Sequence, residues 1–521
     1  IERIEVVRGP GGSLWGANAV TGTVNIIRKT AIQSAGTIVS AGSGTADPWR
    51  VAASHGGAQP KFQYRISGKA AARAAQATPG DLDYDDARML QGGARVDWPK
   101  GAGGFTLQGD IYRSVIGQRD TMTSYTPPAN DVRITDDTLS GGNILFRWQR
   151  RASNPRSLRV QAYFDRTTRS ELTFKEQQNV AELDVQQGLA RGRHSLLFGA
   201  GYRAIHGHTQ TSGTLRFFPP DRTDQLYTAF AQDEVNLLRD RLALTVGTKF
   251  EHNEYSGAEW QPSARLLWSP ARSHAVSLSA NRSVRTPSRV EHDLETGILA
   301  SLQGPTFVRL QPNPEFQSEA LTAYELGVIS MPHPKTLITA AAFHNDHDRV
   351  LSLEPGTTFV EIEGGGPRVI VPLRLGNGLR GTSTGIEVTA DVRPTTWLQT
   401  TMNYSSLRVR MVRRPGSTDA GQERRYEEGS PRHQLQASAS LKLSGQTTVD
   451  WFFRHVSALP ALAVPSYSTS NVTVQFALNR EFSLIASGRN LHEATHVEFT
   501  EGGNGLIGIR RSVYVGLRWT R

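Results

Sequence analysis

The sequence contains no cysteine, few apolar residues and no long apolar run. Its 521 residues include 0 Cys, and hydrophobic residues make up 38% of the chain, less than is usual for a globular protein. A chain without cysteine cannot mispair thiols in an oxidising compartment, so this absence is compatible with export. No stretch approaches the roughly 20 consecutive apolar residues of a membrane-spanning helix, which excludes a helical membrane protein. A transmembrane β-barrel is not excluded, because its strands alternate lipid-facing and lumen-facing residues.

Signatures of nucleotide binding and of hydrolysis are also missing. The glycine-rich start of the chain lacks the Lys-Ser/Thr of a phosphate-binding loop and the G-x-G-x-x-G of a dinucleotide site. The pattern G-x-S-x-G occurs at 381–385, but it leads into a segment of alternating polarity and lacks the strand-turn-helix context of a nucleophile elbow. The formal net charge is +10, but the basic residues are scattered, whereas a nucleic-acid-binding protein gathers them on one face. We therefore expect no enzyme, no catalytic residue, no cofactor and no nucleic-acid partner.

The first thirty residues carry the densest local pattern. The sequence predicts a strand at 4–7, a glycine-proline turn at 9–12, an apolar knuckle at 14–17 and a second strand at 23–27. Glycines in such a segment permit a positive φ or a close backbone approach, so this segment is expected to pack tightly against something else. The residues of this turn motif are Gly9, Pro10, Gly16, Asn18, Gly22 and Asn25.

After residue 30 the sequence settles into segments of about ten residues with alternating polarity, the length of a membrane-spanning strand. In 195–204, 471–478 and 512–519, apolar residues occupy every second position, and in 241–250 they do so at 242, 244, 246 and 250. We count about 22 such segments between residues 35 and 519. The sequence therefore predicts an all-β fold, a transmembrane antiparallel barrel over residues 35–521 preceded by a separate segment at 1–34.

The connections between these segments alternate in length. Short ones are predicted at 57–60, 99–103, 151–156, 191–193, 239–240, 270–273, 331–335, 393–395 and 479–480. Long ones are predicted at 115–138, 206–223, 285–319, 350–379, 411–430 and 491–507. Short turns on one rim and long loops on the other are typical of outer-membrane barrels, in which the long loops face outward.

The stretch R-G-P-G-G-S-L-W-G-A-N-A-V-T-G-T-V-N-I-I, residues 8–27, resembles the end of the plug domain of TonB-dependent outer-membrane receptors. Further segments are similar to barrel motifs of that family and follow in family order: 281–290, 313–319, 324–327, 385–388, 430–433, 464–467, 490–492 and 511–519. His492 stands where the family usually has Phe, and the chain ends on Thr520-Arg521 instead of an aromatic residue. The resemblance covers essentially the whole chain. It implies that residues 1–34 are the C-terminal end of a plug and that residues 35–521 form the barrel.

The resemblance implies energy-coupled uptake of a scarce nutrient across the outer membrane of a Gram-negative cell. A ferric siderophore is the commonest ligand in the family; cobalamin, haem or a glycan are alternatives, and a passive porin or a surface adhesin are rivals from other classes. The implied partners are the inner-membrane TonB complex, outer-membrane lipid with lipopolysaccharide, and a small nutrient chelate, for a monomeric receptor. The chain begins inside a structural element, so the export signal, the TonB box and most of the plug are expected to precede Ile1.

The resemblance also implies a lock between plug and barrel. Arg8 resembles an arginine that pairs with barrel glutamates in this family, and these glutamates match Glu325 and Glu387. The residues on both sides of each glutamate are apolar, which independently predicts that both glutamates point into the lumen. Only one strand separates their two strands, so their backbones should lie about 10 Å apart. The alternative is that both glutamates are merely hydrated lumen residues.

Histidines and aspartates offer weaker candidates. Several histidines are expected to be ordinary polar loop residues, with contact to the iron of a haem or metal chelate as the alternative; they are His206, His208, His344 and His347, with a further pair at His492 and His496. Four aspartates cluster at Asp81, Asp83, Asp85 and Asp86. They lack the spacing of a calcium-binding EF-hand and are expected, at most, to bind divalent ions loosely. The sequence therefore predicts no defined metal site.

Overall fold

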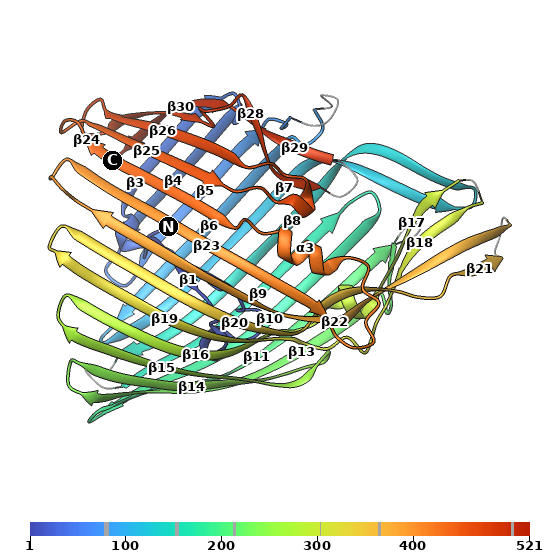
Figure 1. Cartoon of the computed structure of the whole chain (residues 1–521). Coiled ribbons are helices and arrows are strands. Elements are labelled where there is room, and N and C mark those ends of the chain that lie inside the picture. Colours follow the sequence, from blue (N-terminus) through green and yellow to red (C-terminus); the bar gives the residue numbers. More distant parts are fainter. Residues whose placement is uncertain (78–82, 152–155, 212–214, 303, 363–365, 502–504) are drawn as a thin grey trace.

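The computed structural model describes residues 1–77, 83–151, 156–211, 215–302, 304–362, 366–501 and 505–521. The chain forms a closed, antiparallel barrel of 22 strands (Figure 1), as the sequence predicts. In the part of the chain that is described, no helix reaches the length and apolar content that a membrane crossing requires.

The barrel wall follows the order of the chain. Its strands are β3 (Gly36–Gly44), β4 (Trp49–Ala58), β5 (Gln63–Arg73), β6 (Ala87–Lys100), β7 (Gly103–Tyr125), β8 (Pro128–Arg151), β9 (Arg156–Ser170), β10 (Phe174–Arg191), β11 (His194–Thr211), β13 (Asp221–Leu238), β14 (Leu242–Asn253), β15 (Gly257–Ala271), β16 (His274–Arg285), β19 (Glu319–His333), β20 (Thr336–Pro355), β22 (Pro367–Val392), β23 (Leu398–Arg413), β24 (His433–Lys442), β25 (Thr447–Val456), β26 (Tyr467–Ala477), β27 (Phe482–Arg489) and β30 (Ser512–Thr520). The last strand, β30, pairs with both β27 and the first wall strand, β3, and thereby closes the sheet without an edge.

The predicted alternation of faces is confirmed. On β19, Tyr324, Leu326 and Val328 are 48%, 48% and 38% exposed on the outside, while Glu325 between them lines an internal cavity. Ile386 and Val388 flank the inward-facing Glu387 on β22 in the same way. Because the exposed outer face is apolar and the inner face polar, the wall suits lipid outside and a wet lumen inside.

Several strands are much longer than expected. β7, β8 and β22 contain 23, 24 and 26 residues, and the predicted loop at 115–138 is wrong. The ladder between β7 and β8 continues from Ile116↔Asp137 to Tyr125↔Pro128, so this region is an extended hairpin. Beyond the lipid, continued pairing is the simplest way to satisfy backbone N–H and C=O groups, and it lengthens the strands at one end of the barrel only.

The two rims therefore differ (Figure 1). Tight turns such as 101–102, 192–193 and 334–335 join the strands at one end, which we call the short-turn rim. The other end, the long-loop rim, carries additional elements: β12 (Leu215–Phe217), α2 (Arg289–Asp293), β17 (Leu294–Ser301), β18 (Thr306–Gln311), β21 (Phe359–Ile362), α3 (Gln422–Glu428), η3 (Pro460–Leu462), β28 (Thr495–Glu501) and β29 (Gly505–Arg510). The long-loop rim also has short connections, at 45–48, 171–173 and 254–256, so the segregation by length is less strict than the sequence predicts.

An outer lobe projects from the long-loop rim, built from the tip of the β7–β8 hairpin with β17, β18, β21 and the start of β22 (Figure 1). Leu299, Phe307 and Ile370 form its buried core, and the Tyr125 ring packs edge-on against Phe307 with a centroid distance of 4.6 Å. β18 and β22 pair in parallel, from Thr306↔Val369 onward, in an otherwise antiparallel sheet. The lobe is therefore a small folded unit and not a set of independent loops.

One ion cluster closes the outer lobe. Arg309 and Arg368 both bind the Glu361 carboxylate, at 2.8 and 2.7 Å, and both guanidinium groups lie over the Tyr125 ring. The hydrogen bond from Arg309, helped by that from Arg368, lowers the pKa of Glu361 to about 2. Both arginine side chains are less than one-tenth exposed, so the carboxylate neutralises charge that is removed from water.

Inside the barrel lies an inner segment, residues 1–34 (Figure 1). β1 (Arg3–Arg8) pairs with β2 (Gly22–Ile27) in an antiparallel hairpin, which confirms both predicted strands. The apolar knuckle predicted at 14–17 overlaps the end of the short helix α1 (Gly12–Trp15), and η1 (Ile32–Ser34) leads into β3. We refer to residues 9–18 as the tip.

The ion cluster predicts a pH dependence for the outer lobe. A carboxyl with an ordinary pKa of 4.5 and a folded-state pKa of about 2 contributes stability that is complete above pH 4.5 and is lost as the pH falls towards 2. A spin label at position 362, where Ile362 is 79% exposed, should therefore become more mobile between pH 4.5 and pH 2. In Glu361→Gln the label should be mobile already at pH 6 and insensitive to pH. An equally large pH response in Glu361→Gln would contradict this assignment.

Candidate functional site

The first contact between the inner segment and the wall involves the predicted lock residues. Arg8 Nη1 donates to Glu387 Oε2 at 2.5 Å, across the lumen-facing side of β22. The second glutamate, Glu325, lies beside the next residue: a Cβ atom on Gly9, which has φ +72°, would stand 3.3 Å from Glu325 Oε2. Arg8, Glu325 and Glu387 all line the same cavity. The structure thus brings the three predicted residues together, with the ion pair formed to Glu387.

The second contact is a cradle for the tip, formed by Glu251, Gln261 and Ser283 on β14, β15 and β16. Ala17 N donates to Glu251 Oε2 at 2.7 Å, and Gln261 Nε2 donates to the same oxygen at 2.9 Å. Gly12 N donates to Ser283 Oγ at 3.2 Å. The cradle residues are at most 3% exposed, so these hydrogen bonds form away from water, where an unmade bond is costly.

Two glycines of the tip are required by this cradle. A Cβ atom on Gly12 would lie 2.5 Å from Gln261 Oε1 and 2.6 Å from Ser283 Oγ. A Cβ atom on Gly16, whose φ is +87°, would lie 2.2 Å from an oxygen of Glu251. The close backbone approach that the glycine-rich sequence predicts is therefore made against the barrel wall.

The remaining residues of the turn motif have local roles. Asn18, with φ 71°, occupies the left-handed region that Asn tolerates better than most residues, and its backbone N–H donates to Val284 O at 2.8 Å. Asn25 Nδ2 donates to Glu5 Oε2 at 3.0 Å across the hairpin. Pro10 borders the larger of the two cavities described below. Gly22 leaves room for the Val7 carbonyl oxygen of the facing strand β1.

A third contact holds the end of the inner segment to another part of the wall. Arg28 Nη1 lies 2.7 Å from Asp110 Oδ2 on β7, and Ala31 N donates to Asp97 Oδ2 on β6 at 2.8 Å. These strands lie about half-way round the closed strand order from β22. The inner segment is therefore anchored to different sides of the lumen beside its tip and at its exit into β3.

Two cavities adjoin the tip. The larger one, of about 1270 Å³, is bordered by Arg8, Gly9, Pro10 and Asn18 of the inner segment. Its wall includes Arg265, Arg285, Glu319, Glu325, His347, Glu387 and Tyr426. A smaller cavity of about 560 Å³ includes Trp15, Lys249, Glu251 and Tyr255. A small ligand in either cavity would touch the wall and the tip at once.

The candidate histidines do not form a site. His206 and His208 belong to β11, and His344 and His347 to β20, so their prediction as loop residues is wrong; the long ladders extend past them. His206, His208 and His344 share the outward face and pair there with Thr223, Asp221 and Asp346. His347 alone of the four borders the large cavity, where it contacts Ser383 Oγ at 2.9 Å.

The other candidate ligands are separately engaged. His496 lies in β28 and contacts Glu498 at 2.7 Å, and the His492 ring packs against Phe453. Of the acidic cluster, Asp81 lies outside the described residues, Asp83 faces Arg510, and Asp85 accepts a hydrogen bond from Gln76 N. Across the described part of the chain, no three His, Asp or Glu side chains gather as metal ligands.

The cradle predicts that Gly16→Ala will loosen the tip. Gly257 offers a matched control, because its φ is +68° and a Cβ atom there would meet nothing within 4 Å. Gly16→Ala costs about 1–3 kcal/mol of backbone strain, because the φ of 87° and ψ of −166° at Gly16 are a combination that essentially only glycine adopts. Gly257→Ala also places a side chain at a positive φ, but only Gly16→Ala forces the Glu251 carboxylate away from the Ala17 N–H. Hydrogen exchange of peptides covering residues 9–18 should be faster in Gly16→Ala and unchanged in Gly257→Ala. Equal exchange in both variants would mean that the cradle does not hold the tip.

Comparison with known proteins agrees with this architecture. The family model described as TonB dependent receptor-like, beta-barrel, matches residues 33–491. Among curated proteins, the vitamin B12 transporter BtuB of Vibrio vulnificus is 47% identical over 45 residues, which is 9% of this chain and 7% of that protein. BtuB of Vibrio cholerae is 51% identical over 47 residues, or 9% of this chain and 8% of that protein. The matched stretch is thus a small part of these relatives.

Solved structures are similar over almost the whole chain. The siderophore receptor PirA of Acinetobacter baumannii has a TM-score of 0.78 at 15% identity, covering 99% of this chain and 85% of that one. A variant of the ferric enterobactin receptor PfeA of Pseudomonas aeruginosa has a TM-score of 0.77 at 16% identity, covering 100% and 85%. The FrpB iron transporter of Neisseria meningitidis has a TM-score of 0.77 at 12% identity, covering 99% and 87%. At these identities the likeness concerns the fold.

Proposed function

The chain belongs to the TonB-dependent receptors, outer-membrane proteins with this barrel, and on that premise we propose that it takes up a ferric siderophore. The observation that carries the proposal is the large cavity, which is bordered partly by the wall and partly by the inner segment. A ligand bound there would contact the element that must move for transport. The siderophore receptors and iron transporter among its structural neighbours support this choice of ligand.

The proposal divides the chain into two parts. Residues 1–34 act as the C-terminal end of a plug, and residues 35–521 act as the barrel. The lock is formed by Arg8 with Glu325 and Glu387, and the inner-membrane TonB complex supplies the energy. The long-loop rim faces the outside and the short-turn rim faces the periplasm. The receptor works as a monomer in lipid and lipopolysaccharide.

Cobalamin is a second candidate ligand. It is favoured by one observation, the short stretches that are 47% and 51% identical to vitamin B12 transporters. The large cavity offers either ligand polar partners, because its lining mixes arginine, glutamate, histidine and amide side chains.

Uptake measurements in the source strain test the proposal. The gene would be deleted, and the uptake of radioactive iron from ferric enterobactin and from ferrichrome would be compared with that of labelled cobalamin. We expect loss of uptake from one ferric siderophore, its restoration by a plasmid copy, and its absence when TonB is inactivated. Loss of cobalamin uptake alone would favour the second candidate. Unchanged uptake of all three compounds would contradict both ligand proposals.

The proposed lock predicts non-additive effects. Arg8→Ala should loosen the plug, and because the Arg8 side chain is 55% exposed, we expect a loss of roughly 1 kcal/mol and not the roughly 3–5 kcal/mol of a buried pair. Glu325→Ala with Glu387→Ala should have a similar effect, and the triple variant should be little worse. The measurement is the sensitivity of cells to large antibiotics that enter through a leaking barrel.

Arg3→Ala is the matched control for the lock. Arg3 is also 55% exposed, but it hydrogen-bonds Glu5 of its own strand at 2.7 Å. It should leave antibiotic sensitivity unchanged. Additive effects in the triple variant, or a leak in Arg3→Ala as large as that in Arg8→Ala, would show that the three residues do not act as a unit.

A further inference from the structure

A ten-residue strap, Val284–Asp293, runs from the end of β16 through helix α2 and separates the two cavities. Thr286, Pro287 and Ser288 border the large cavity on one side and the small cavity on the other. The strap is thus the part of the wall that a ligand in either cavity would meet.

The inner end of the strap holds the tip. Asn18 N donates to Val284 O at 2.8 Å, Thr286 N donates to Asn18 Oδ1 at 3.1 Å, and Asn18 Nδ2 lies 3.4 Å from Thr286 Oγ1. Two of these contacts use backbone atoms of the strap, the Val284 carbonyl oxygen and the Thr286 N–H. A shift of the strap backbone therefore moves the hydrogen-bond partners of Asn18.

The middle of the strap is fixed by charge. The Arg285 guanidinium bridges Glu291 of the strap and Glu319 of β19, both at 2.9 Å. Ser288 and Glu291 form a complete capping box at the start of α2. These contacts hold the strap in one conformation and attach it to β19, so the distance between its two ends is restricted.

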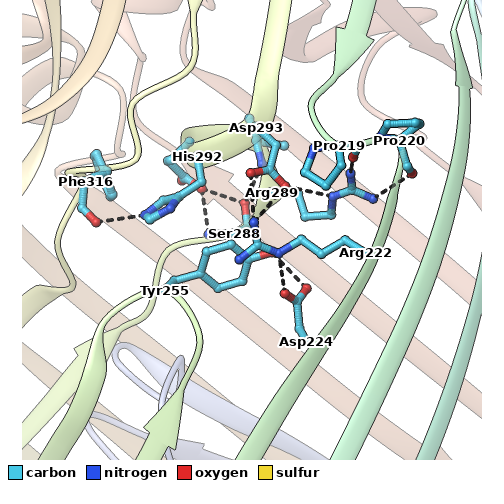
Figure 2. A network of polar contacts seen from close by, with 12 residues as sticks. Pro219, Pro220, Arg222, Asp224, Tyr255, Ser288, Arg289, His292, Asp293 and Phe316 are labelled. Carbon is cyan, nitrogen blue, oxygen red and sulfur yellow. Dashed lines mark hydrogen bonds and ion pairs between the residues drawn. The ribbon is translucent and has the colours of Figure 1, made fainter.

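The outer end of the strap joins the long-loop rim (Figure 2). Asp293 binds Arg222 of β13 and Arg289 of the strap, both at 3.1 Å. The Arg222 guanidinium lies over the Tyr255 ring, 4.3 Å from its centre, and the Tyr255 hydroxyl donates to Asp224. Asp293 is 4% exposed, so this junction is buried.

We propose that the strap positions the tip according to the arrangement of the outer loops, with Asp293 at its outer junction and Thr286 at its inner junction. The contacts described above follow one another along ten residues, and in this proposal they carry a displacement of the outer junction to the inner one. On the proposed function, a ligand that presses on 286–288 would thereby loosen the tip. Coupling of this kind is reciprocal: loosening the tip also loosens the strap.

Spin labels test the coupling without ligand or TonB, so the result does not depend on the proposed function. The chain contains 0 Cys, and a single cysteine at position 14, where Leu14 is 41% exposed, gives a specific label on the tip. Asp293→Ala breaks the outer junction without touching the tip. We expect the label spectrum of the purified chain in lipid vesicles to shift towards its mobile component. Glu361→Ala, which breaks a comparable ion cluster in the outer lobe, should leave the spectrum unchanged.

The reverse experiment labels the strap at position 290, where Val290 is 45% exposed. Asn18→Gly removes the side-chain contacts of Asn18 and keeps a residue that accepts its positive φ. It should increase the mobility of the label on the strap. Far-UV circular dichroism identifies variants that retain the barrel. An unchanged spectrum at position 14 in folded Asp293→Ala would overturn the proposal, as would an equal shift in Glu361→Ala, which would indicate general loosening.

Discussion

The rest of the structure depends on one constraint, the closed ring of backbone hydrogen bonds. In lipid a strand can satisfy its N–H and C=O groups only with its neighbours, so the sheet must have no edge. Pairing of β30 with β3 meets that requirement and brings the last strand against the first. Once the ring is closed, alternation along each strand decides which residues point inward. Asp97, Glu251 and Glu387, far apart in sequence, thus face one lumen.

The inner segment uses these inward-facing groups as its attachment points. Three of its contacts end on wall carboxylates or hydroxyls: Glu387 for the ion pair, Glu251 and Ser283 for the tip, Asp110 and Asp97 for the exit. These contacts differ in burial. The Arg8 side chain is about half exposed, whereas the cradle residues are closed to water. On the proposed function, water-accessible pairs that are individually weak, combined with a few buried hydrogen bonds, suit a segment that is held in place and can be released.

The sequence contains enough information for the barrel and for part of the site. Strict alternation around Glu325 and Glu387 predicts their inward direction, and the inner hairpin follows from two apolar runs around a glycine-proline turn. The cradle could not be predicted from the sequence. Glu251 and Gln261 lie in strands whose alternation resembles that of the other wall strands, and only the packing of the tip against them identifies their role. Ser283 lies inside the stretch 281–290, which is similar to a barrel motif of the family, and that similarity could have identified it as a candidate. The histidines lie in strands and not in the predicted loops. The strand ladders continue beyond the lipid, and there the sequence no longer shows the apolar alternation that predicts a strand.

The geometry of the β1–β2 hairpin has a mechanical consequence. Ile1 lies at the open end of the hairpin. Ile27 ends the second strand at the same end, and the chain that follows it is bound to the wall at Arg28 and Ala31. Tension between Ile1 and the wall would therefore act across the open end and separate the paired residues one after another, beginning at Arg3↔Ile27. Unzipping of this kind breaks a few bonds at a time, whereas shearing would have to break the whole ladder together. The hairpin is thus oriented so that tension at Ile1 would load its ladder one pair at a time.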